Sequence, residues 1–304
     1  MLKFQAYNVE TLLHSGFKSS AEPEIEWLRK CELSEEDFID LKRLCDILGI
    51  TFLATPESLE WATFLAEIGV PAFKISSLNI DNYRLLEHIA RFDKPIILST
   101  GMAYIDEIYP ALEKFGNCKY ALLHCVSQYP ADFNSVNLKA IKALKKAFSC
   151  PVGFSDHTVA GYASMHAIPA GADIIEVHIT YDSAAKGPDH NFSLSMDILK
   201  DYVFMLRSIE RMLGNGIKAP HESEIAGGYV QQKRRCCVAY KDIKVGEEFL
   251  PGSITCLCPG DEGVVSAAEY QKLTGGSYIA LEDIKKGTPI YKKAVGRKQC
   301  PRKF

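Results

Sequence analysis

The stretch AFKISSLNIDNYRLLEHIARFDKPIILST, residues 72–100, decides the fold class. Two short apolar runs, AFKISS (72–77) and PIILST (95–100), flank an amphipathic segment, NYRLLEHIARF (82–92). Continuous apolar runs are typical of strands that are buried on both faces, as in a parallel sheet covered by helices. The stretch therefore predicts a strand–helix–strand unit of an α/β protein.

The same alternation of apolar runs and amphipathic segments extends along the first two thirds of the chain. The runs with the composition of buried strands are residues 2–7, 50–56, 72–77, 95–100, 120–126, 151–158 and 173–181. Between them we expect helices: one capped by Ser34, one that begins at Glu57, others at 82–92, 104–116 and 137–148, and the longest from Ser195 to Gly214. This order is typical of a (β/α) barrel.

Seven such strands are one fewer than a closed eight-stranded barrel contains. The chain opens inside a strand, LKFQAY (2–7). We therefore expect a TIM-type (β/α) barrel that lacks its first strand–helix unit. A doubly wound sheet is the alternative, but the Gly-rich turn GxGxxG of its nucleotide-binding members is absent from the sequence.

The composition excludes several classes of function. The chain has 304 residues, 47% of them hydrophobic, and a formal net charge of −3, so no nucleic acid is expected as a partner, because such proteins carry a basic excess. No apolar run reaches the roughly 18 residues that cross a bilayer. The N-terminal sequence also lacks the features of a signal peptide, and we expect a cytoplasmic protein with no membrane partner.

The sequence changes character after residue 215. The segment that follows is polar, with Pro and a Gly pair, and is typical of a linker. We expect a barrel domain at 1–215, a linker at 216–231, a small β-rich domain at 232–296 and a tail at 297–304.

The small domain contains a weak internal repeat, VAYKDIKVGEEFL (238–250) and IALEDIKKGTPIY (279–291). Each copy predicts two strands joined by a turn. The cysteines of the chain form no CxxC pair, and the zinc sites that such pairs build are not expected.

Polar side chains occur where several predicted strands end, and in a (β/α) barrel that edge carries the active site. Lys3 and Gln5 share one face of the first strand, and Lys74 and Ser77 end the third. A buried lysine is costly unless it is paired or bound to an anion. With the hydroxyls of Ser77 and Ser99 and nearby backbone N–H groups, the two lysines predict a phosphate or carboxylate site.

Histidines stand at matching ends of two neighbouring strands, at His157 and His178. Their imidazoles could share one divalent metal ion, with water and substrate oxygens in the other positions. Each histidine by itself is more typical of a structural residue, but GPDH (187–190) just beyond them favours a site. Asp156 either orients a histidine or binds a local backbone amide.

Nine short motifs occur in the order seen in the sialic acid synthase family, which includes N-acetylneuraminate, legionaminate and pseudaminate synthases. They are KFQ (3–5), FKISS (73–77), LSTGM (98–102), HCVSQYP (124–130), NLKAI (137–141), VGFSDHT (152–158), EVHIT (176–180), GPDH (187–190) and SLSMDIL (193–199). The combination is specific although no single motif is. The chain therefore resembles this family, and its small domain resembles the antifreeze-like SAF domain.

The resemblance implies a transferase that condenses phosphoenolpyruvate with an open-chain N-acylated hexosamine, such as N-acetylmannosamine, and releases phosphate. A Mn²⁺ or Mg²⁺ ion would polarise the sugar aldehyde. By the resemblance, phosphoenolpyruvate is held by Lys3, Lys74, Ser77, Ser99 and Ser155, the sugar by Gln5, Tyr129 and Asp189, and the metal ion by His157 and His178. Tyr129 is also expected to be a catalytic residue.

The resemblance also implies an assembly. In this family the SAF domain of one subunit closes over the barrel of its partner, so we expect a domain-swapped homodimer. The alternative is a folding cap that does not contact the substrate, although closure over a buried substrate is common in enzymes.

Several positions depart from the family pattern. Asn79 occupies a catalytic position, two residues after Ser77, at which the family carries an acidic residue for proton handling, and an amide cannot act as a general base. Val177 replaces a basic residue, Ser127 an asparagine of some members, and Cys258 the arginine of an Arg-Pro-Gly motif. Two functions therefore stay open: an active synthase, and a non-catalytic or regulatory homologue that binds sugar acid or phosphoenolpyruvate without turnover.

Overall fold

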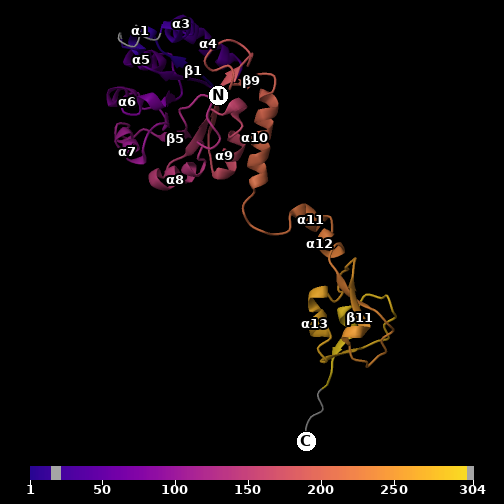
Figure 1. Cartoon of the computed structure of the whole chain (residues 1–304). Coiled ribbons are helices and arrows are strands. Elements are labelled where there is room, and N and C mark those ends of the chain that lie inside the picture. The colour runs from indigo at the N-terminus through magenta and orange to yellow at the C-terminus, as the bar shows by residue number, and fades with distance from the viewer. Residues whose placement is uncertain (15–21, 300–304) are drawn as a thin grey trace. The chain divides into compact units, whose positions relative to one another are not determined.

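The computed structural model describes residues 1–14 and 22–299, which form two compact units. The first unit is Met1–Asn215, and the second begins at Gly216 (Figure 1). Each unit has a hydrophobic core of its own. Residues 300–304, the end of the expected tail, lie outside the described residues.

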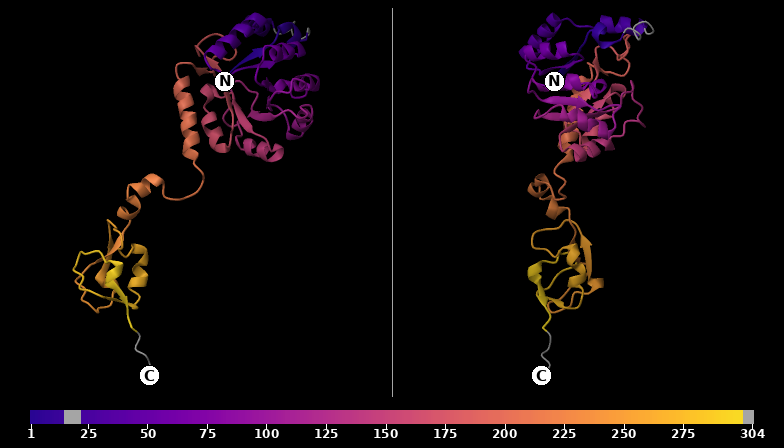
Figure 2. Two further views of the ribbon diagram at one scale, coloured as in Figure 1. Left: turned by 180° about the vertical axis from the view of Figure 1, so that it is seen from behind. Right: turned by 90° about the vertical axis from the view of Figure 1, so that its left-hand side faces the viewer.

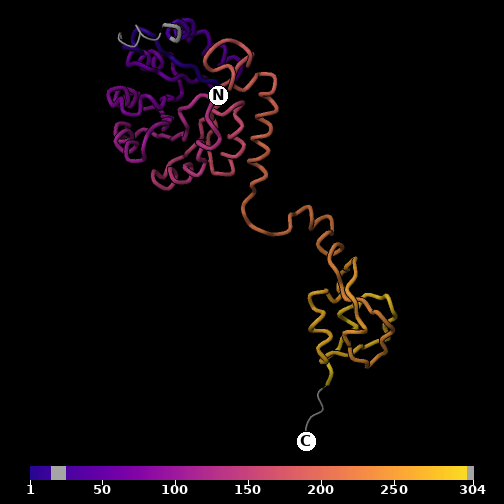
Figure 3. The backbone as a smooth tube through the Cα atoms, in the orientation of Figure 1, coloured from indigo at the N-terminus to yellow at the C-terminus, as the bar shows by residue number. Residues whose placement is uncertain are grey.

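Parallel strands β1 to β7 form the centre of the first unit. β1 pairs with β2, β2 lies beside β3, and β3 to β7 form one sheet in chain order. The colour in Figure 3 therefore changes steadily around the unit. The predicted α/β class with a parallel sheet is confirmed, and the strands make a half barrel. They are Leu2–Ala6, Phe52–Pro56, Phe73–Ile75, Ile96–Ser99, Tyr120–Cys125, Val152–Asp156 and Ile175–Val177.

Helices cover the outer side of these strands (Figure 1 and Figure 2). They are α1 (Val9–Leu12), α3 (Glu22–Lys30), α4 (Glu35–Ile47), α5 (Leu59–Glu67), α6 (Tyr83–Ala90), α7 (Ile105–Glu113), α8 (Lys139–Phe148), α9 (Ser164–Ala170) and α10 (Leu199–Leu213). Across the described part of the chain, no helix combines the length and apolar character that crossing a membrane requires.

Successive residues of each strand face opposite sides of the sheet. In β3, Phe73 and Ile75 belong to the core between strands and helices, where Phe52 of β2 and Phe154 of β6 also lie. Lys74 stands between Phe73 and Ile75, so its side chain points to the other, inner face. Burial of the apolar outer face therefore fixes the direction in which the polar inner residues point.

The predicted start of one helix is confirmed, and the predicted start of the next helix is wrong. Ser34 caps α4 as predicted, and its hydroxyl accepts a hydrogen bond from the Asp37 backbone in a reciprocal capping box. The prediction that the next helix begins at Glu57 is wrong. Ser58 is the cap, because its hydroxyl accepts from the Trp61 backbone, and Glu57 stays at the end of β2.

The last strand and the last helix of the first unit also need correction. The run at 173–181 is divided into β7 and a two-residue strand, β8 (Ile179–Thr180), which pairs with β9 (Leu194–Ser195). Ser195 is therefore part of a strand and cannot begin the final helix, which starts four residues later at Leu199.

The internal repeat of the second unit folds as two copies that bind each other reciprocally. Ile243 and Ile284 exchange both of their backbone hydrogen bonds, each at 2.8 Å. Asp242 accepts a hydrogen bond from the backbone of the second copy at 2.8 Å, and Asp283 accepts one from the backbone of the first at 2.9 Å. The two copies therefore make equivalent contacts in opposite directions.

The second segment of each copy, predicted as a strand, forms only isolated bridges, at Glu248, Pro289 and Tyr291. Pro289 has no N–H to donate, so a ladder cannot continue through it.

Two short helices, α11 and α12, lie within the polar stretch that follows Gly216. The elements of this unit are α11 (Glu222–Ala226), α12 (Tyr229–Gln232), β10 (Cys236–Ala239), β11 (Ile254–Leu257), α13 (Tyr270–Leu273), β12 (Tyr278–Ala280) and β13 (Val295–Arg297).

We expect Gly153→Ala to destabilise the first unit. A Cβ atom at this position of β6 would lie closer than 3.0 Å to the Ile174 backbone oxygen and to a Leu123 methyl carbon, and overpacking of this kind costs about 1–3 kcal/mol. Both tryptophans, Trp27 and Trp61, lie in the first unit, so urea unfolding followed by tryptophan fluorescence reports the change. An unchanged unfolding midpoint would contradict the close approach of Ile174 and Leu123 to Gly153.

Candidate active site

A cluster of charges and hydroxyls lies on the inner face of the strands, near their carboxyl ends. Lys74 of β3 donates a hydrogen bond to the Ser99 hydroxyl of β4 at 2.6 Å, and its Nζ lies 3.7 Å from Glu176 Oε2 of β7. Lys3 Nζ of β1 lies 3.4 Å from Glu176 Oε1, which also accepts a hydrogen bond from Ser155 of β6 at 2.8 Å. Residues from distant parts of the sequence therefore form one connected group.

The electrostatics of this cluster follow from its burial. Lys74 is only 3% exposed, and burial lowers the pKa of its ammonium group, while the Glu176 carboxylate acts in the opposite direction. Burial by itself would raise the pKa of Glu176, but Lys74, Lys3 and the Ser155 hydroxyl together bring it down to about 2. Two ammonium groups face one carboxylate, so the cluster keeps a net positive charge that can attract an anion.

Ser77 lies next to this cluster, at the start of a short 3₁₀ turn. Its hydroxyl accepts a hydrogen bond from the Gly101 backbone N–H at 2.9 Å and lies 3.3 Å from the Cys125 sulfur. The sequence predicts that backbone N–H groups of this loop bind a ligand anion. In the structure the Gly101 N–H is instead used to hold the loop against Ser77.

Two imidazoles and a phenol ring form a second cluster on the same edge. The rings of His157 and His178 have centroids 5.5 Å apart, and Tyr129 packs on His157 with centroids 4.3 Å apart. His157 Nδ1 lies 2.7 Å from the Val126 carbonyl oxygen, and His178 Nδ1 lies 3.4 Å from Asp189 Oδ2. Each imidazole is thus oriented by an oxygen atom at Nδ1, and Nε2 points away from that oxygen.

The protonation of this second cluster suits binding of a ligand through nitrogen. Burial lowers the pKa of His157, which favours the neutral ring that can act as a metal ligand. The hydrogen bond with His178 lowers the pKa of Asp189, and burial raises the pKa of Tyr129 to about 12. The phenol therefore stays protonated and can donate a hydrogen bond at neutral pH.

Ser155 joins the two clusters. Its hydroxyl donates to Glu176 and lies 3.4 Å from His157 Nε2. Of the predicted site residues, the structure brings Lys3, Lys74, Ser99 and Ser155 into the ion cluster, and Tyr129, His157, His178 and Asp189 into the imidazole cluster. Ser77 and Asn79 lie beside the ion cluster, on the turn that follows Lys74.

Glu57 is a residue of this site that was not predicted from the sequence. Its carboxylate oxygen Oε2 accepts a hydrogen bond from the Asn79 side-chain amide at 2.5 Å and another from the Ser76 hydroxyl at 3.2 Å. Burial raises the pKa of Glu57 to about 7, against the opposing effects of these hydrogen bonds and of Lys74 and Lys3. The signal was the period of two in β2, which puts residues 53, 55 and 57 on one face.

Gln5 and Thr55 lie side by side where β1 and β2 pair. Gln5 is exposed, which leaves its amide available to a ligand. The Thr55 hydroxyl is buried and is the one buried side-chain polar atom without a hydrogen-bond partner among the described residues. An unpaired buried hydroxyl is costly, so this part of the inner face also has unused hydrogen-bonding capacity.

Asp156 lies on the opposite face of β6 from the imidazoles. Its two carboxylate oxygens accept hydrogen bonds from the backbone and the hydroxyl of Thr158 and from the backbone and the hydroxyl of Ser164, at 2.7–2.8 Å. Of the two roles that the sequence left open, the structure therefore shows the local one. Asp156 holds the loop after β6 and the start of α9 in place.

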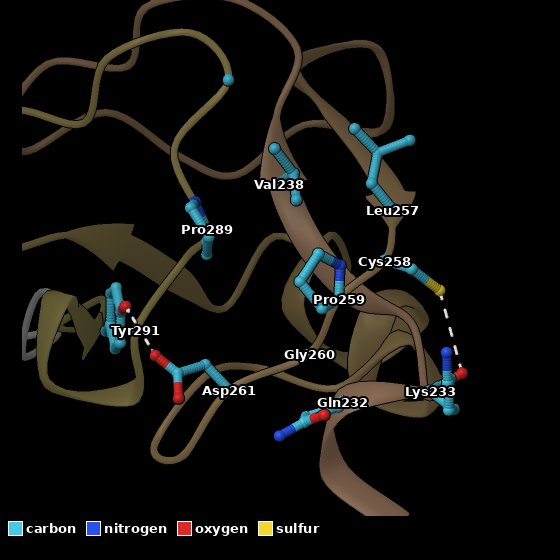
Figure 4. Close-up of a pocket in the computed structure, with 11 residues that line it drawn as sticks. Gln232, Lys233, Val238, Leu257, Cys258, Pro259, Gly260, Asp261, Pro289 and Tyr291 are labelled. Carbon is cyan, nitrogen blue, oxygen red and sulfur yellow. Dashed lines mark hydrogen bonds between the residues drawn. The ribbon is translucent and has the colours of Figure 1, made fainter. Parts of the chain in front are cut away.

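A pocket of about 570 Å³ lies in the second unit (Figure 4). Cys258, Pro259 and Gly260 form part of its wall, and Asp261 beside them accepts a hydrogen bond from Tyr291 at 3.3 Å. Its lining contains no histidine or glutamate. The charged residues of its lining are Lys233 and Asp261, and the Cys258-Pro-Gly segment lies on a concave surface.

The described residues contain no group of three or more His, Cys, Asp or Glu side chains arranged to hold a metal ion. A metal ion at the imidazole cluster would therefore have two protein nitrogen ligands, from His157 and His178. Its other positions would be left for water and substrate oxygens.

Comparisons with known proteins find relatives over most of the chain. Residues 1–218 match the NeuB family. The uncharacterized protein MJ1065 of Methanocaldococcus jannaschii is 42% identical over 262 residues, which are 85% of this chain and 76% of that protein. The N,N'-diacetyllegionaminic acid synthase of Campylobacter jejuni is 38% identical over 290 residues, 90% of this chain and 85% of the synthase. The crystal structure of an N-acetylneuraminic acid synthetase from Leptospira borgpetersenii has a TM-score of 0.69 at 34% identity, and the match covers 75% of this chain and 79% of that one.

We expect Glu176→Gln to destabilise the first unit by about 3–5 kcal/mol, because it leaves the buried Lys74 charge without its partner. Glu87→Gln is the matched control. It removes the partner of a partly exposed lysine, Lys114 at 2.9 Å, and ion pairs at the surface contribute about 0–1 kcal/mol. Urea unfolding at pH 7 measures both variants, and equal losses would contradict the assigned role of Glu176.

The lowered pKa of Glu176 predicts that the free energy of unfolding depends on pH. The pKa of Glu176 falls from its ordinary value of 4.5 to about 2 on folding, so its contribution to stability is complete above pH 4.5 and is lost as the pH falls toward 2. The difference in unfolding free energy between wild type and Glu176→Gln should shrink over this range. A difference that does not change between pH 6 and pH 3 would refute the assignment.

Proposed function

This chain belongs to the NeuB family, and we propose that it is a nonulosonic acid synthase that condenses phosphoenolpyruvate with an open-chain N-acylated hexosamine. The observation that carries the proposal is the joined pair of clusters on the inner face. A net positive group of lysines and hydroxyls lies beside two oriented imidazoles, and Ser155 contacts both. These are the groups needed to hold a phosphorylated acid next to a polarised aldehyde.

The proposed reaction forms one carbon–carbon bond. Carbon 3 of phosphoenolpyruvate attacks the aldehyde carbon of the sugar, and the aldehyde oxygen takes up a proton. Water then adds at carbon 2 and gives up a proton. The bond from carbon 2 to the phosphate oxygen breaks, the proton of the new hydroxyl leaves with the phosphate, and the products are a 2-keto nonulosonic acid and inorganic phosphate.

Lys3 and Lys74 are proposed to bind the phosphate and carboxylate groups of phosphoenolpyruvate, with the hydroxyls of Ser77, Ser99 and Ser155. The buried Lys74 ammonium is held by Ser99 and by the Ile75 carbonyl oxygen at 3.1 Å, so its position is fixed before an anion arrives. A fixed charge requires little reorganisation on binding, which strengthens electrostatic stabilisation.

Gln5, Tyr129 and Asp189 are proposed to face the sugar. Tyr129 is half exposed and lies over His157, with its hydroxyl protonated at neutral pH. Gln5 is exposed beside β2, and Asp189 belongs to the loop after β8. Hydrogen-bonding groups on a rim of this kind are suited to sugar hydroxyls and to an N-acyl group.

His157 and His178 are proposed to hold a Mn²⁺ or Mg²⁺ ion. The residues fit such an ion, because both rings are oriented through Nδ1 and the pKa of His157 is lowered toward the neutral form. When bound, the ion would supply Lewis-acid polarisation of the sugar aldehyde. Imidazole ligands favour manganese over magnesium.

The second unit is proposed to be an SAF-type domain that closes over the barrel of a partner in a domain-swapped homodimer. Its reciprocal two-copy core, built on Ile243 and Ile284, supports a compact module. Cys258 lines its pocket where the family carries an arginine, so we expect this surface to contact a sugar without a guanidinium group at that position.

We expect sugar-dependent release of phosphate when the purified protein is incubated with phosphoenolpyruvate, Mn²⁺ and a panel of N-acylated hexosamines. The panel should include N-acetylmannosamine and diacylated deoxyhexosamines, and the sugar that triggers release identifies the substrate. Phosphoenolpyruvate binding without release for any sugar would contradict the proposal and would indicate the non-catalytic homologue.

We expect His157→Ala to weaken Mn²⁺ binding at least about tenfold, because loss of the partners of metal ligands already costs 10–100-fold in affinity. Electron paramagnetic resonance of free Mn²⁺ measures the affinity directly, without turnover. His166→Ala, an exposed histidine on α9, is the matched control and should leave binding unchanged. Equal affinities of wild type and His157→Ala would refute the ligand assignment.

A further inference from the structure

The proposed reaction needs a group that gives a proton to the aldehyde oxygen and takes one from water, and Asn79 cannot do this. We propose that Glu57, at the end of β2, is the general acid and base of this site, and that Asn79 is the residue that positions its carboxyl group. This inference rests on the proposed function. The proposal also explains why residue 79 is an amide: the acidic group is carried by its neighbour Glu57 instead.

The contacts of Glu57 place its carboxyl group at the edge of the ion cluster. Its Oε2 atom receives hydrogen bonds from Asn79 at 2.5 Å and from Ser76 at 3.2 Å. Both donors lie on the segment directly after Lys74. The backbone N–H of Glu57 binds the Ala6 carbonyl oxygen at 3.0 Å, so the residue continues the pairing of β1 and β2 and is held at both ends.

Asn79 has a fixed orientation that suits this role. It is 3% exposed, and its carbonyl oxygen accepts a hydrogen bond from the Asn82 amide at 2.9 Å. Its NH₂ group must therefore point toward Glu57. A carboxylate at position 79 would meet the Glu57 carboxylate at hydrogen-bond distance, and two such charges repel each other.

The other carboxylates of the site are held by positive or potentially positive partners. Glu176 faces both Lys3 and Lys74, at 3.4 and 3.7 Å, and protonation would leave those two charges unbalanced. Asp189 is paired with His178. Glu57 accepts its two hydrogen bonds from neutral groups instead, so it can gain or lose a proton without breaking an ion pair.

The charged groups that act on Glu57 from the neighbouring strands are Lys3 of β1 and Lys74 of β3, and both lower its pKa. Burial outweighs them and sets the pKa of Glu57 at about 7. Both forms of the carboxyl are then present at neutral pH, which is the condition under which one group can act as acid and as base. The environments of Glu57 and Glu176 shift their pKa values in opposite directions. Such a pair of carboxyl groups in one site is typical of two different chemical roles.

The Glu57 carboxyl group can account for both proton transfers of the reaction. The protonated Glu57 carboxyl gives its proton to the aldehyde oxygen as the carbon–carbon bond forms. The resulting carboxylate then takes a proton from the water that adds at carbon 2, which returns the carboxyl group to its first state. No further acid or base is required for these two steps.

The test compares Glu57→Gln with Glu60→Gln, an exposed glutamate of α5 three residues away. We expect Glu57→Gln to lower kcat for phosphate release by about 10²–10⁴-fold, with KM for phosphoenolpyruvate changed less than about threefold. The pH profile of wild type should show an inflection near pH 7 that Glu57→Gln removes. Glu60→Gln should behave as wild type.

The double variant Glu57→Gln/Asn79→Asp exchanges the amide and the acid. It should recover at least about tenfold of the lost kcat, which a purely structural role of Glu57 does not predict. Wild-type kcat in Glu57→Gln, or failure of the exchange to recover any activity in a folded protein, would overturn the proposal. A wild type that releases no phosphate with any sugar would instead overturn the proposed function, and this inference with it.

Thermal unfolding gives a readout that does not depend on turnover. The pKa of Glu57 is raised from 4.5 to about 7, so the folded state holds its proton where the unfolded state has lost it, and stability falls as the pH rises from 4.5 through 7. Glu57→Gln should therefore raise the Tm relative to wild type at pH 8 and leave it unchanged at pH 4. The same Tm difference at both pH values would show that Glu57 does not titrate as proposed.

Discussion

Burial of the Lys74 ammonium group is the constraint on which the first unit depends. A charge that is only 3% exposed must be paired, because leaving it unpaired would cost several kcal/mol. Its partner, Glu176, comes from β7, and Glu176 in turn is shared with Lys3 of β1. These pairs require the two ends of the strand order to approach across the inner face, so the electrostatics and the curvature of the half barrel support each other.

The two glutamates of this edge show how position within one fold separates chemical roles. Glu176 lies close to two lysines, which lower its pKa to about 2, so it is ionised at neutral pH. Glu57 directly follows β2, the strand beside that of Lys74, but its direct contacts are an amide and a hydroxyl. One carboxylate therefore provides a permanent charge that organises the anion site, and the other provides a proton that can move.

This arrangement changes the interpretation of the sequence departures. Asn79 in a position that carries an acid in the family suggests a lost function when the residue is considered alone. In the structure its amide is oriented by Asn82 and donates to Glu57, so an acid is present next to position 79, on the segment that follows β2. No arginine lines the pocket beside Cys258, and the charged residues of that lining are Lys233 and Asp261 of the same unit.

The sequence by itself determined the parallel α/β class, the positions of the first six strands, the cap at Ser34 and the residue types of the two clusters, because these depend on local spacing and on the cost of burying polar groups. It misplaced the helix starts at Glu57 and Ser195, where a side-chain cap and a strand pair compete with helical propensity. Only the tertiary structure showed that Glu57 meets Asn79, that Glu176 joins two lysines, and that Asp156 faces away from the imidazoles. Each of these contacts joins residues whose meeting depends on how the strands and loops are arranged in space, and apolar patterns along the chain do not record such distances.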